Sequence, residues 1–286
     1  MMAATLPFSI LGRLYDTVPQ LLRPVEFRAV QTADELRAAS HLVYLEHLKR
    51  NYVRPNAMQV RLSIYHALPT TTTFIARDRR AGILGTISLL EDSPLGLPMD
   101  DSYKNELDEL RKRNLHLGEA SMLVLNSELF GRKVSTLFHP KKLLLTLRLL
   151  KAMFDYLRSS TSVNELVTCV NLKHRALFEF LQLKPLGGPK SYSGANSTSS
   201  VARHLNILEA QYNPVSPAHQ FFYGEPPSPK AFANRLRLSP TDLRTLFVIL
   251  SPVLASASRT ELDYLKRCYP AYDFTTILQP PIHATA

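Results

Sequence analysis

Apolar residues recur along this chain with two different periods, which predicts strands and helices in alternation. Residues 24–30 (PVEFRAV) have the spacing of a strand. Residues 32–50 (TADELRAASHLVYLEHLKR) predict an amphipathic helix, and Thr32 followed by Glu35 is the signature of a helix start. A strand followed by a helix therefore opens the regular part of the chain.

The middle of the chain continues this alternation. A hairpin is predicted around the turn at Asp78 to Gly82, and Pro140 favours a long helix that begins there. The order is strand, helix, hairpin, helix, strand, helix, strand, helix, strand, which fits a mixed sheet covered by helices, an α/β (α+β) class. The predicted ranges after the first helix are hairpin strands 71–78 and 82–92, a polar helix 101–113, strand 118–125, the long helix, strand 165–171, a short helix 172–183 and strand 200–208.

Composition divides the chain into three parts. Residues 1–24 form an N-terminal apolar arm with several prolines, and residues 25–210 carry the alternating pattern. Residues 211–286 are rich in Pro and Ser and contain short helical segments. We interpret this last part as a C-terminal helical extension, not as a second catalytic domain.

One carboxylate stands in an otherwise apolar predicted strand, GEASMLVL at 118–125. Burying an ionised carboxylate is costly, so such a group is paired, neutralised or used in chemistry. Glu119 is therefore either the structural partner of a neighbouring arginine or a functional carboxylate whose pKa is raised by burial. Simple alternation places Glu119, Ser121, Leu123 and Leu125 on one face and Ala120, Met122 and Val124 on the other.

The bulk composition excludes several classes of protein. Cys169 and Cys268 lie far apart and lack metal-ligand spacing, so we expect no metal, no disulfide framework and a reducing, cytoplasmic location. No apolar run reaches the ~20 residues of a membrane span, and the N-terminus lacks the basic start of a secretory signal. The net charge of +10 predicts an acidic partner, but no nucleic-acid motif is present, and we expect no nucleic acid.

Basic residues cluster after the Glu119 strand. The segment 131–151 holds Arg132, Lys133, Lys141, Lys142, Arg148 and Lys151 and no acidic residue. The two lysines at 141 and 142 fall in the first turn of the predicted helix, where cations oppose the helix dipole unless an anion docks. The pattern fits either a solvated basic face or a site for a phosphate with an acidic protein around it.

Four segments resemble the bacterial long-chain N-acyl amino acid synthases, GNAT-fold relatives of the acyl-homoserine-lactone synthases. They are YHALPTTTTFIA (65–76), SPLGLPMD (93–100), ELDELRKRNLHLGEASMLVL (106–125) and HRALFEFLQLKPLGGPKSY (174–192). The resemblance covers roughly residues 25–210 and implies a GNAT fold with a mixed, mostly antiparallel central sheet flanked by helices. It also implies transfer of a long acyl chain from an acyl carrier protein thioester to the amine of an amino acid, with tyrosine the best-known acceptor.

The resemblance implies roles for particular residues. Glu119 is expected to be the active-site carboxylate, which accepts the amine proton or orients the amine. Backbone N–H groups of Met122, Leu123 and Val124 are candidates for stabilising the oxyanion. The donor's phosphopantetheine and its carrier protein are expected to bind at Gly131, Arg132, Lys133, Lys141 and Lys142, and no cofactor is expected to be tightly bound.

The acceptor and the general acid have weaker signals. Candidate acceptor contacts are Tyr65, His66, Thr72 and Ser121. His174 is a candidate acid, with a structural role as its alternative. Phe178 stands where many GNAT enzymes carry a tyrosine acid, which suits a thiolate leaving group because a thiol has a pKa of only ~8.5.

Two departures from related families bear on the function. The homoserine-lactone synthases carry an arginine three residues after the strand glutamate, where this chain has Met122, so lactone synthesis is not expected. The loop LFGRKVST has one glycine where coenzyme-A-dependent GNAT enzymes have R/Q-x-x-G-x-G/A, which favours a carrier-protein donor. Two alternatives stay open: a coenzyme-A-dependent GNAT acyltransferase acting on a small amine, and a catalytically weak module that binds a carrier protein or a membrane. Peripheral membrane contact through the N-terminal arm or the product is also open.

Overall fold

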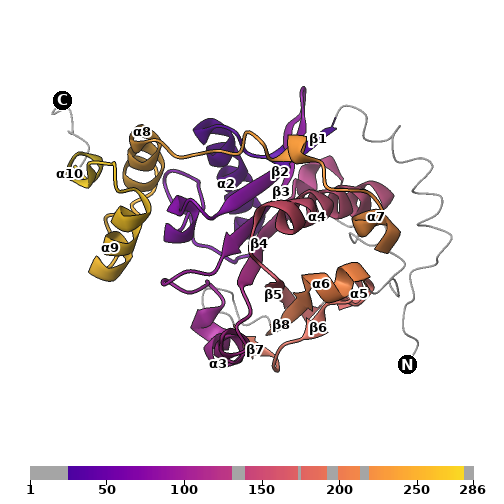
Figure 1. Ribbon diagram of the computed structural model, residues 1–286. Helices are drawn as coiled ribbons and strands as arrows, with labels where there is room; N and C mark the ends of the chain where they lie inside the picture. The colour runs from indigo at the N-terminus through magenta and orange to yellow at the C-terminus, as the bar shows by residue number, and fades with distance from the viewer. Residues whose placement is uncertain (1–24, 131–138, 173–174, 192–198, 213–218, 280–286) are drawn as a thin grey trace.

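Eight strands form one sheet in the computed structural model, which describes residues 25–130, 139–172, 175–191, 199–212 and 219–279. The strand order is β1-β2-β3-β4-β5-β8-β6, and β7 also pairs with β8 (Figure 1). Every pair is antiparallel except β4 with β5, so the predicted mixed and mostly antiparallel sheet is confirmed. The strands are β1 Val25–Ala29, β2 Thr72–Asp78, β3 Gly82–Glu91, β4 Leu117–Leu125, β5 Glu165–Asn171, β6 Lys184–Pro185, β7 Lys190–Ser191 and β8 Ser199–Asn206.

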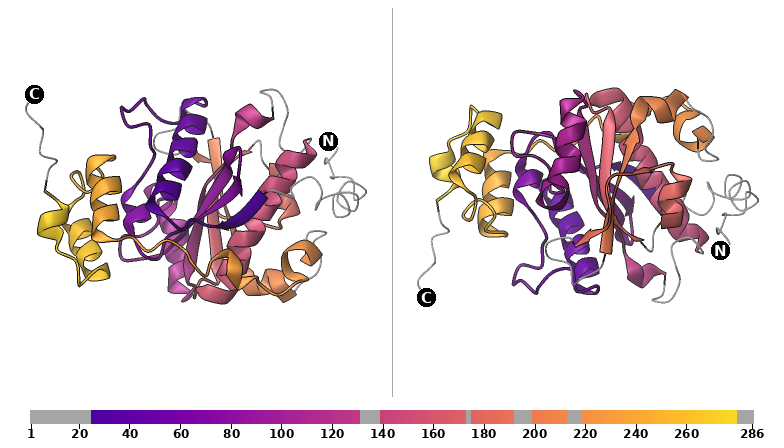
Figure 2. Two further views of the ribbon diagram at one scale, coloured as in Figure 1. Left: turned by 90° about the horizontal axis from the view of Figure 1, so that it is seen from above. Right: turned by 90° about the horizontal axis from the view of Figure 1, so that it is seen from below.

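Helix α4 (Pro140–Ser160) covers one face of this sheet (Figures 1 and 2). Its leucines pack with Phe74 of β2 and Ile87 of β3 in one core cluster. Three shorter helices join the same cluster, namely α5 (Arg175–Phe180), α6 (Ile207–Tyr212) and α7 (His219–Tyr223). This layer is a conventional apolar support for the central strands.

The opposite face is covered by α2 (Ala33–Leu48) and α3 (Asp100–Lys112) and, at the β1 edge, by the C-terminal helices (Figure 2). The C-terminal helices are α8 (Pro240–Arg244), α9 (Arg259–Cys268) and α10 (Phe274–Ile277). Their apolar residues share one core cluster with Val30, Leu36 and Ile75. The segment after residue 210 therefore completes the core over β1 and β2.

The local signals for helix starts and for the hairpin are confirmed. The Thr32 side chain caps α2 by accepting the Glu35 N–H at 3.2 Å, and Pro140 is the first residue of α4. Asp78 accepts two backbone N–H groups, both at 2.8 Å, in the turn between β2 and β3. These features depend only on neighbouring residues, which is why the sequence pattern identifies them.

The residue facing predicted for β4 is wrong beyond Ser121, because the strand contains a bulge. Thr86 of β3 pairs with Val124 and Ser88 pairs with Ser121, so β4 has one residue more than β3 between these pairs. Met122 lies in this interval with a left-handed φ of 55°. An inserted residue reverses the facing of everything that follows it.

The packing shows the reversal directly. Leu123 and Leu125 contact the α4-side core together with Ala120. Met122 and Val124 instead pack against α2. Simple alternation places Leu123 and Leu125 on the same face as Glu119, whereas in the structure they lie on the opposite face.

Strands β4 and β5 separate shortly after they begin. Their parallel ladder consists of Leu117↔Glu165, Gly118↔Leu166 and Glu119↔Val167. Within the described residues, β4 from Ser121 onward has no strand partner on the β5 side, although Thr168 Oγ1 still donates to the Ala120 carbonyl at 2.8 Å. Glu119 thus lies at the point where the sheet opens.

Several short elements were not predicted. The strands β6 and β7 have two residues each, too few for a periodic pattern. The others are the 3₁₀ turns η1 Ile64–Ala67, η2 Ser127–Leu129 and η5 Pro229–Ala231. The π-helical turn η6 Thr245–Ile249 directly continues α8 and lies in a segment predicted to be helical.

Two further expectations concern the chain as a whole. Among the helices of the described ranges, none combines the length and hydropathy that crossing a bilayer requires. The N-terminal arm, residues 1–24, lies outside the described residues, and the predicted division at residue 210 stays a prediction.

Candidate active site

Glu119 is a buried carboxylate in the centre of the sheet. Its exposed fraction is 2%, and its Oε2 accepts the backbone N–H of Met99 at 2.9 Å. The Ser121 hydroxyl makes a second hydrogen bond to the carboxylate. Both donors approach one group, so the orientation of the side chain is fixed before any ligand binds.

Burial raises the pKa of Glu119 to about 8. The negative charges of Asp100 and Asp101 add to this increase, whereas the hydrogen bonds from Met99 and Ser121 act against it. The carboxyl group therefore titrates near neutral pH, the range in which a carboxylate serves as a proton acceptor.

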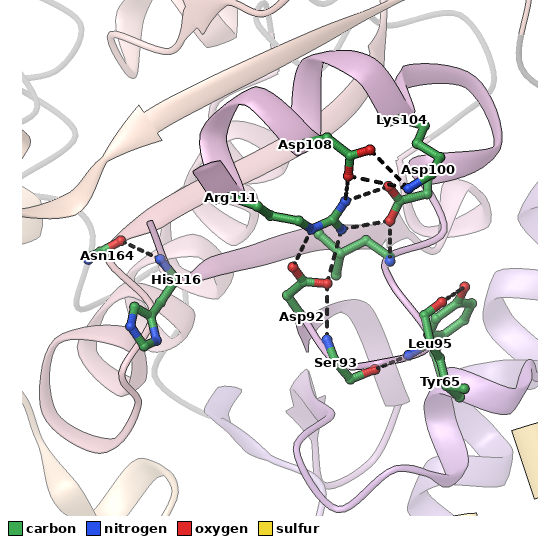
Figure 3. A network of polar contacts seen from close by, with 11 residues as sticks. Tyr65, Asp92, Ser93, Leu95, Asp100, Lys104, Asp108, Arg111, His116 and Asn164 are labelled. Atoms are coloured by element: carbon green, nitrogen blue, oxygen red, sulfur yellow. Dashed lines mark hydrogen bonds and ion pairs between the residues drawn. The ribbon is translucent and has the colours of Figure 1, made fainter. Parts of the chain in front are cut away.

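No arginine neutralises Glu119 within the described residues, which argues against the structural-partner interpretation. The nearby guanidinium of Arg111 binds other carboxylates instead (Figure 3). Its nitrogens contact Asp92 at 2.7 and 3.0 Å, Asp100 at 2.7 Å through two nitrogens and Asp108 at 2.8 Å. Arg111 thus links α3 to the segment from Asp92 to Asp100 that precedes it.

This arrangement positions the N–H group that binds Glu119. Asp100 also accepts the Leu97 N–H at 2.7 Å (Figure 3). Asp100 thus holds the turn from Leu97 to Asp100 through this hydrogen bond and links it to Arg111 through the ion pair. A Cβ on Gly96, whose φ is 71°, would lie 2.5 Å from Asp100 Oδ2. The GLPMD segment therefore needs glycine at 96 and supplies Met99 to the carboxylate.

Two of the predicted acceptor residues interact with Glu119. Ser121 contacts the carboxylate directly, and Tyr65 lies within electrostatic range of it. The Tyr65 hydroxyl donates to the Leu95 carbonyl at 3.4 Å, and burial raises the pKa of Tyr65 to about 12. Tyr65 is a neutral hydrogen-bonding group at the edge of the site.

The other two predicted acceptor residues lie elsewhere. His66 and Thr72 line a pocket at the β1 edge of the sheet whose wall does not include Glu119. Their neighbour Thr73 shares a buried hydroxyl hydrogen bond of 2.9 Å with Ser88, which pairs across strands with Ser121. The structure therefore divides the predicted set between two places.

The predicted oxyanion segment coincides with the bulge. Met122, Leu123 and Leu125 are partly exposed although they belong to a central strand. Bulges near the open part of a sheet redirect backbone groups away from the ladder. Val124, the third residue of the predicted oxyanion segment, is buried.

The predicted donor site is only partly described. Gly131, Arg132, Lys133 and the candidate acid His174 lie outside the described residues. Lys141 is exposed, whereas Lys142 is buried with its ammonium 5.4 Å from the centre of the Phe130 ring. Lys151 is paired with Asp155 at 3.1 Å, and Phe178 is buried in the α4-side core. The basic segment is therefore partly used in internal contacts.

Sequence reasoning missed several contributors. Met99 acts through its backbone, and Arg111 binds three aspartates that are spread over the segment 92–108, so neither leaves a local signal. Cys169 of β5 lies within electrostatic range of Glu119, and burial raises the pKa of its thiol. The described residues hold no cluster of His, Cys, Asp and Glu suited to a metal ion.

Comparison with known proteins identifies one matching sequence family. The sequence profile of a family described as N-acyl amino acid synthase FeeM matches residues 38–206, more than half of the chain. The solved structure of FeeM, an N-acyl amino acid synthase from uncultured soil microbes, is 23% identical with a TM-score of 0.56, over 69% of this chain and 96% of that one. This likeness shows a shared fold.

Two further structures are more distant. The AHL synthase LasI is 16% identical with a TM-score of 0.48, over 71% of this chain and 95% of its own. The CoA-dependent acyl-homoserine lactone synthase BjaI is 16% identical with a TM-score of 0.49, over 75% and 95%. No curated protein sequence matches the chain.

Proposed function

The chain belongs to the FeeM family of N-acyl amino acid synthases and is an N-acyltransferase, and from this premise we propose its donor, acceptor and catalytic residue. It transfers a long-chain acyl group from the phosphopantetheine thioester of an acyl carrier protein to the α-amine of an amino acid. Tyrosine is the proposed acceptor, and Glu119 is the residue that receives the amine proton.

This proposal rests on the environment of Glu119 and on its raised pKa. The carboxyl group is buried, oriented by Met99 and Ser121, and has no cationic partner among the described residues. Its pKa of about 8 makes the carboxylate a much better acceptor for the proton of a bound ammonium than a glutamate with an ordinary pKa would be. A bound ammonium would also supply the missing positive charge.

The reaction follows from this match. Glu119 removes a proton from the ammonium, and the freed amine attacks the carbonyl carbon of the thioester. The tetrahedral intermediate carries an oxyanion, for which backbone N–H groups of Met122 to Val124 are the proposed donors. The attacking nitrogen still carries one proton more than the amide needs, and the departing thiolate takes up this proton as the C–S bond breaks and the amide forms. The proton held by Glu119 passes to solvent, which restores the carboxylate.

The donor proposal rests on charge and on the open edge of β4. An extended pantetheine arm needs backbone groups to bind, and β4 beyond Glu119 is without a strand partner on the β5 side of the described sheet. The net charge of +10 and exposed Lys141 favour an acidic carrier protein. Coenzyme A, which has the same phosphopantetheine arm, is the second candidate donor.

The acceptor proposal rests on the groups around Glu119. Tyr65 and Ser121 offer hydroxyl groups at the edge of the site. We propose that the reaction takes place in the cytoplasm, where acyl carrier protein and free amino acids coexist. The free thiols of Cys169 and Cys268 are compatible with that reducing compartment.

Mass spectrometry of lipid extracts from a bacterial host expressing the chain tests the proposal. New N-acyl amino acids should appear with the intact chain and disappear with Glu119→Gln. Glu109→Gln, a change on the exposed side of α3, is the matched control and should leave the products unchanged. Equal product from Glu119→Gln would overturn the catalytic assignment.

A second assay separates the donors. Purified enzyme receives the same acyl chain on acyl carrier protein or on coenzyme A, with tyrosine as acceptor. A much higher kcat/KM with the carrier protein is the expected result. Equal or better use of the coenzyme A thioester would replace the proposed donor.

A further inference from the structure

A pocket of about 250 Å³ lies where the C-terminal extension crosses the start of β2. Its first wall includes His66, Thr72 and Thr73, and its second wall is formed by Arg235–Leu238 with Tyr269 and Tyr272. Two strand spacings, about 10 Å, separate Thr73 from β4. The family match ends at residue 206, so the second wall comes entirely from residues outside it.

The second wall is held firmly against the sheet. The Leu236 N–H donates to the Val30 carbonyl at 2.7 Å, which extends the sheet edge. The Tyr269 hydroxyl donates to the Ala67 carbonyl and the Tyr272 hydroxyl to the Leu238 carbonyl, each at 2.9 Å. The two tyrosine rings stack with centroids 5.0 Å apart. The pocket is therefore preformed.

Two polar groups of the first wall, the Thr72 hydroxyl and the His66 ring, can each donate a hydrogen bond to a ligand in the pocket. Thr72 is 3% exposed, and its hydroxyl has no hydrogen-bond partner in the described part of the chain. The Ser63 N–H donates to His66 Nδ1 at 3.2 Å, which leaves the ring proton on Nε2. Burial lowers the pKa of His66 to about 4, so the ring is a neutral donor at neutral pH.

The charges at the pocket have one sign. Arg235 and Arg237 belong to its wall, and none of the lining residues is acidic. Arg235 gives one N–H to the Pro69 carbonyl at 3.0 Å and lies within electrostatic range of Glu91, which leaves other guanidinium donors available. Arg237 is exposed and has no ion pair within the described ranges.

The remaining wall is apolar. Val30, Leu36, Leu68 and Leu238 line it beside the tyrosine pair. A bare inorganic anion would leave this surface unused, and an uncharged apolar molecule would leave the donors unpaired. The volume is just below the ~300–1,000 Å³ typical of drug-sized ligands, which limits the occupant to the size of an amino acid or a short acyl chain.

We propose that this pocket is a second ligand site, separate from the Glu119 site, that binds a small carboxylate with an apolar body. The carboxylate accepts hydrogen bonds from Thr72 and His66 and faces the two arginines, and the apolar body lies against the leucines and the tyrosine pair. The site is independent of the acyl-transfer proposal, because it uses other residues and is built by the extension.

Methyl NMR of Leu/Val-labelled full-length protein tests this with hexanoate, hexan-1-ol and inorganic phosphate as separate probes. Hexanoate should shift the Leu236, Leu238 and Val30 methyl signals saturably. The alcohol and phosphate should each bind at least about tenfold more weakly, because the alcohol lacks the carboxylate and phosphate lacks the apolar body. The Leu123 and Leu125 signals report binding at β4 instead.

Arg237→Gln should weaken hexanoate binding about tenfold, and Thr72→Val should weaken it as well. Arg259→Gln, an exposed change in the same extension, is the control of equal charge and should leave binding unchanged. The proposal is overturned if only Leu123 and Leu125 respond, if hexan-1-ol binds as tightly as hexanoate, or if Arg237→Gln and Arg259→Gln behave alike. None of these readouts depends on turnover.

Discussion

The backbone N–H of Met99 donates to the carboxylate of Glu119 at 2.9 Å, across 20 residues of sequence. A hydrogen bond to the ionised form stabilises it, so Met99 keeps the pKa of Glu119 lower than burial alone would. Any change that removes or loosens a donor at this carboxylate should raise that pKa further. The first prediction uses the other donor, Ser121.

Ser121→Ala should move the pH dependence of kcat/KM to higher pH. The hydroxyl lowers the pKa of Glu119, and a base must be deprotonated to act, so losing the hydroxyl shifts the rise in activity upward by about one pH unit. The pH–rate profile of the purified variant measures this. Ser88→Ala, which removes the neighbouring hydroxyl bonded to Thr73, should leave the profile in place. A common shift in both variants would contradict the assignment.

Glu119→Gln should become more stable relative to the intact protein as pH rises. The folded-state pKa of about 8 lies above the ~4.3 of an ordinary glutamate, so folding favours the protonated form. The stability that depends on this proton is complete below about pH 4.5 and is lost as pH rises through about 8. The difference in unfolding free energy should change by roughly 3–5 kcal/mol between pH 5 and pH 9. Urea denaturation of both proteins at the two pH values measures it, and a constant difference would show that Glu119 titrates normally.

Arg111→Gln should destabilise the fold by about 2 kcal/mol and lower activity as well. Asp92 and Asp100 lose the guanidinium that pairs with them, Asp108 keeps only Lys104, and the turn that presents Met99 loses its anchor. Lys112→Gln is the matched control, because the Lys112–Glu109 pair is largely exposed and such pairs contribute little. Denaturant unfolding gives the first effect and kcat/KM the second. Equal effects of the two substitutions would deny Arg111 this role.

Met122→Gly should be more stable than Met122→Ala by about 1 kcal/mol. Both variants lose the same side-chain packing against α2, so the comparison isolates the backbone. At a φ of 55° an L side chain is strained and glycine is not, which reverses the usual order within a strand. Thermal or urea unfolding of the pair decides it, and the opposite order would place Met122 outside the left-handed region.

Local patterns predicted most of the regular elements. The signals that were recognised depend on residues close together in sequence, so the sequence alone reveals them. They are Thr32, Pro140 and the turn at Asp78 to Gly82. The bulge in β4 was missed because it occurs at methionine, whereas glycine or asparagine would have signalled a left-handed residue. One inserted residue then misplaced every later side chain of the strand.

The candidate site was predicted in part for the same reason. Glu119 stands out because a carboxylate interrupts an apolar run, but its donor Met99 contributes only a backbone group. Tyr65 and His66 are sequence neighbours in the predicted acceptor set, yet Tyr65 interacts electrostatically with Glu119 whereas His66 lines the edge pocket. Such separations depend on tertiary contacts that no spacing rule contains.

Contacts between the C-terminal extension and the first two strands also constrain the order in which the chain folds during synthesis. The Tyr269 hydroxyl binds the Ala67 carbonyl 202 positions earlier, and Phe274 and Ile277 pack in one core cluster with Val30 and Ile75. The α4 side of the sheet can assemble while synthesis continues, but the core over β1 and β2 must wait for the extension to emerge. Until then Ile75 and Leu36 lack the apolar residues of the extension that pack with them in the folded protein.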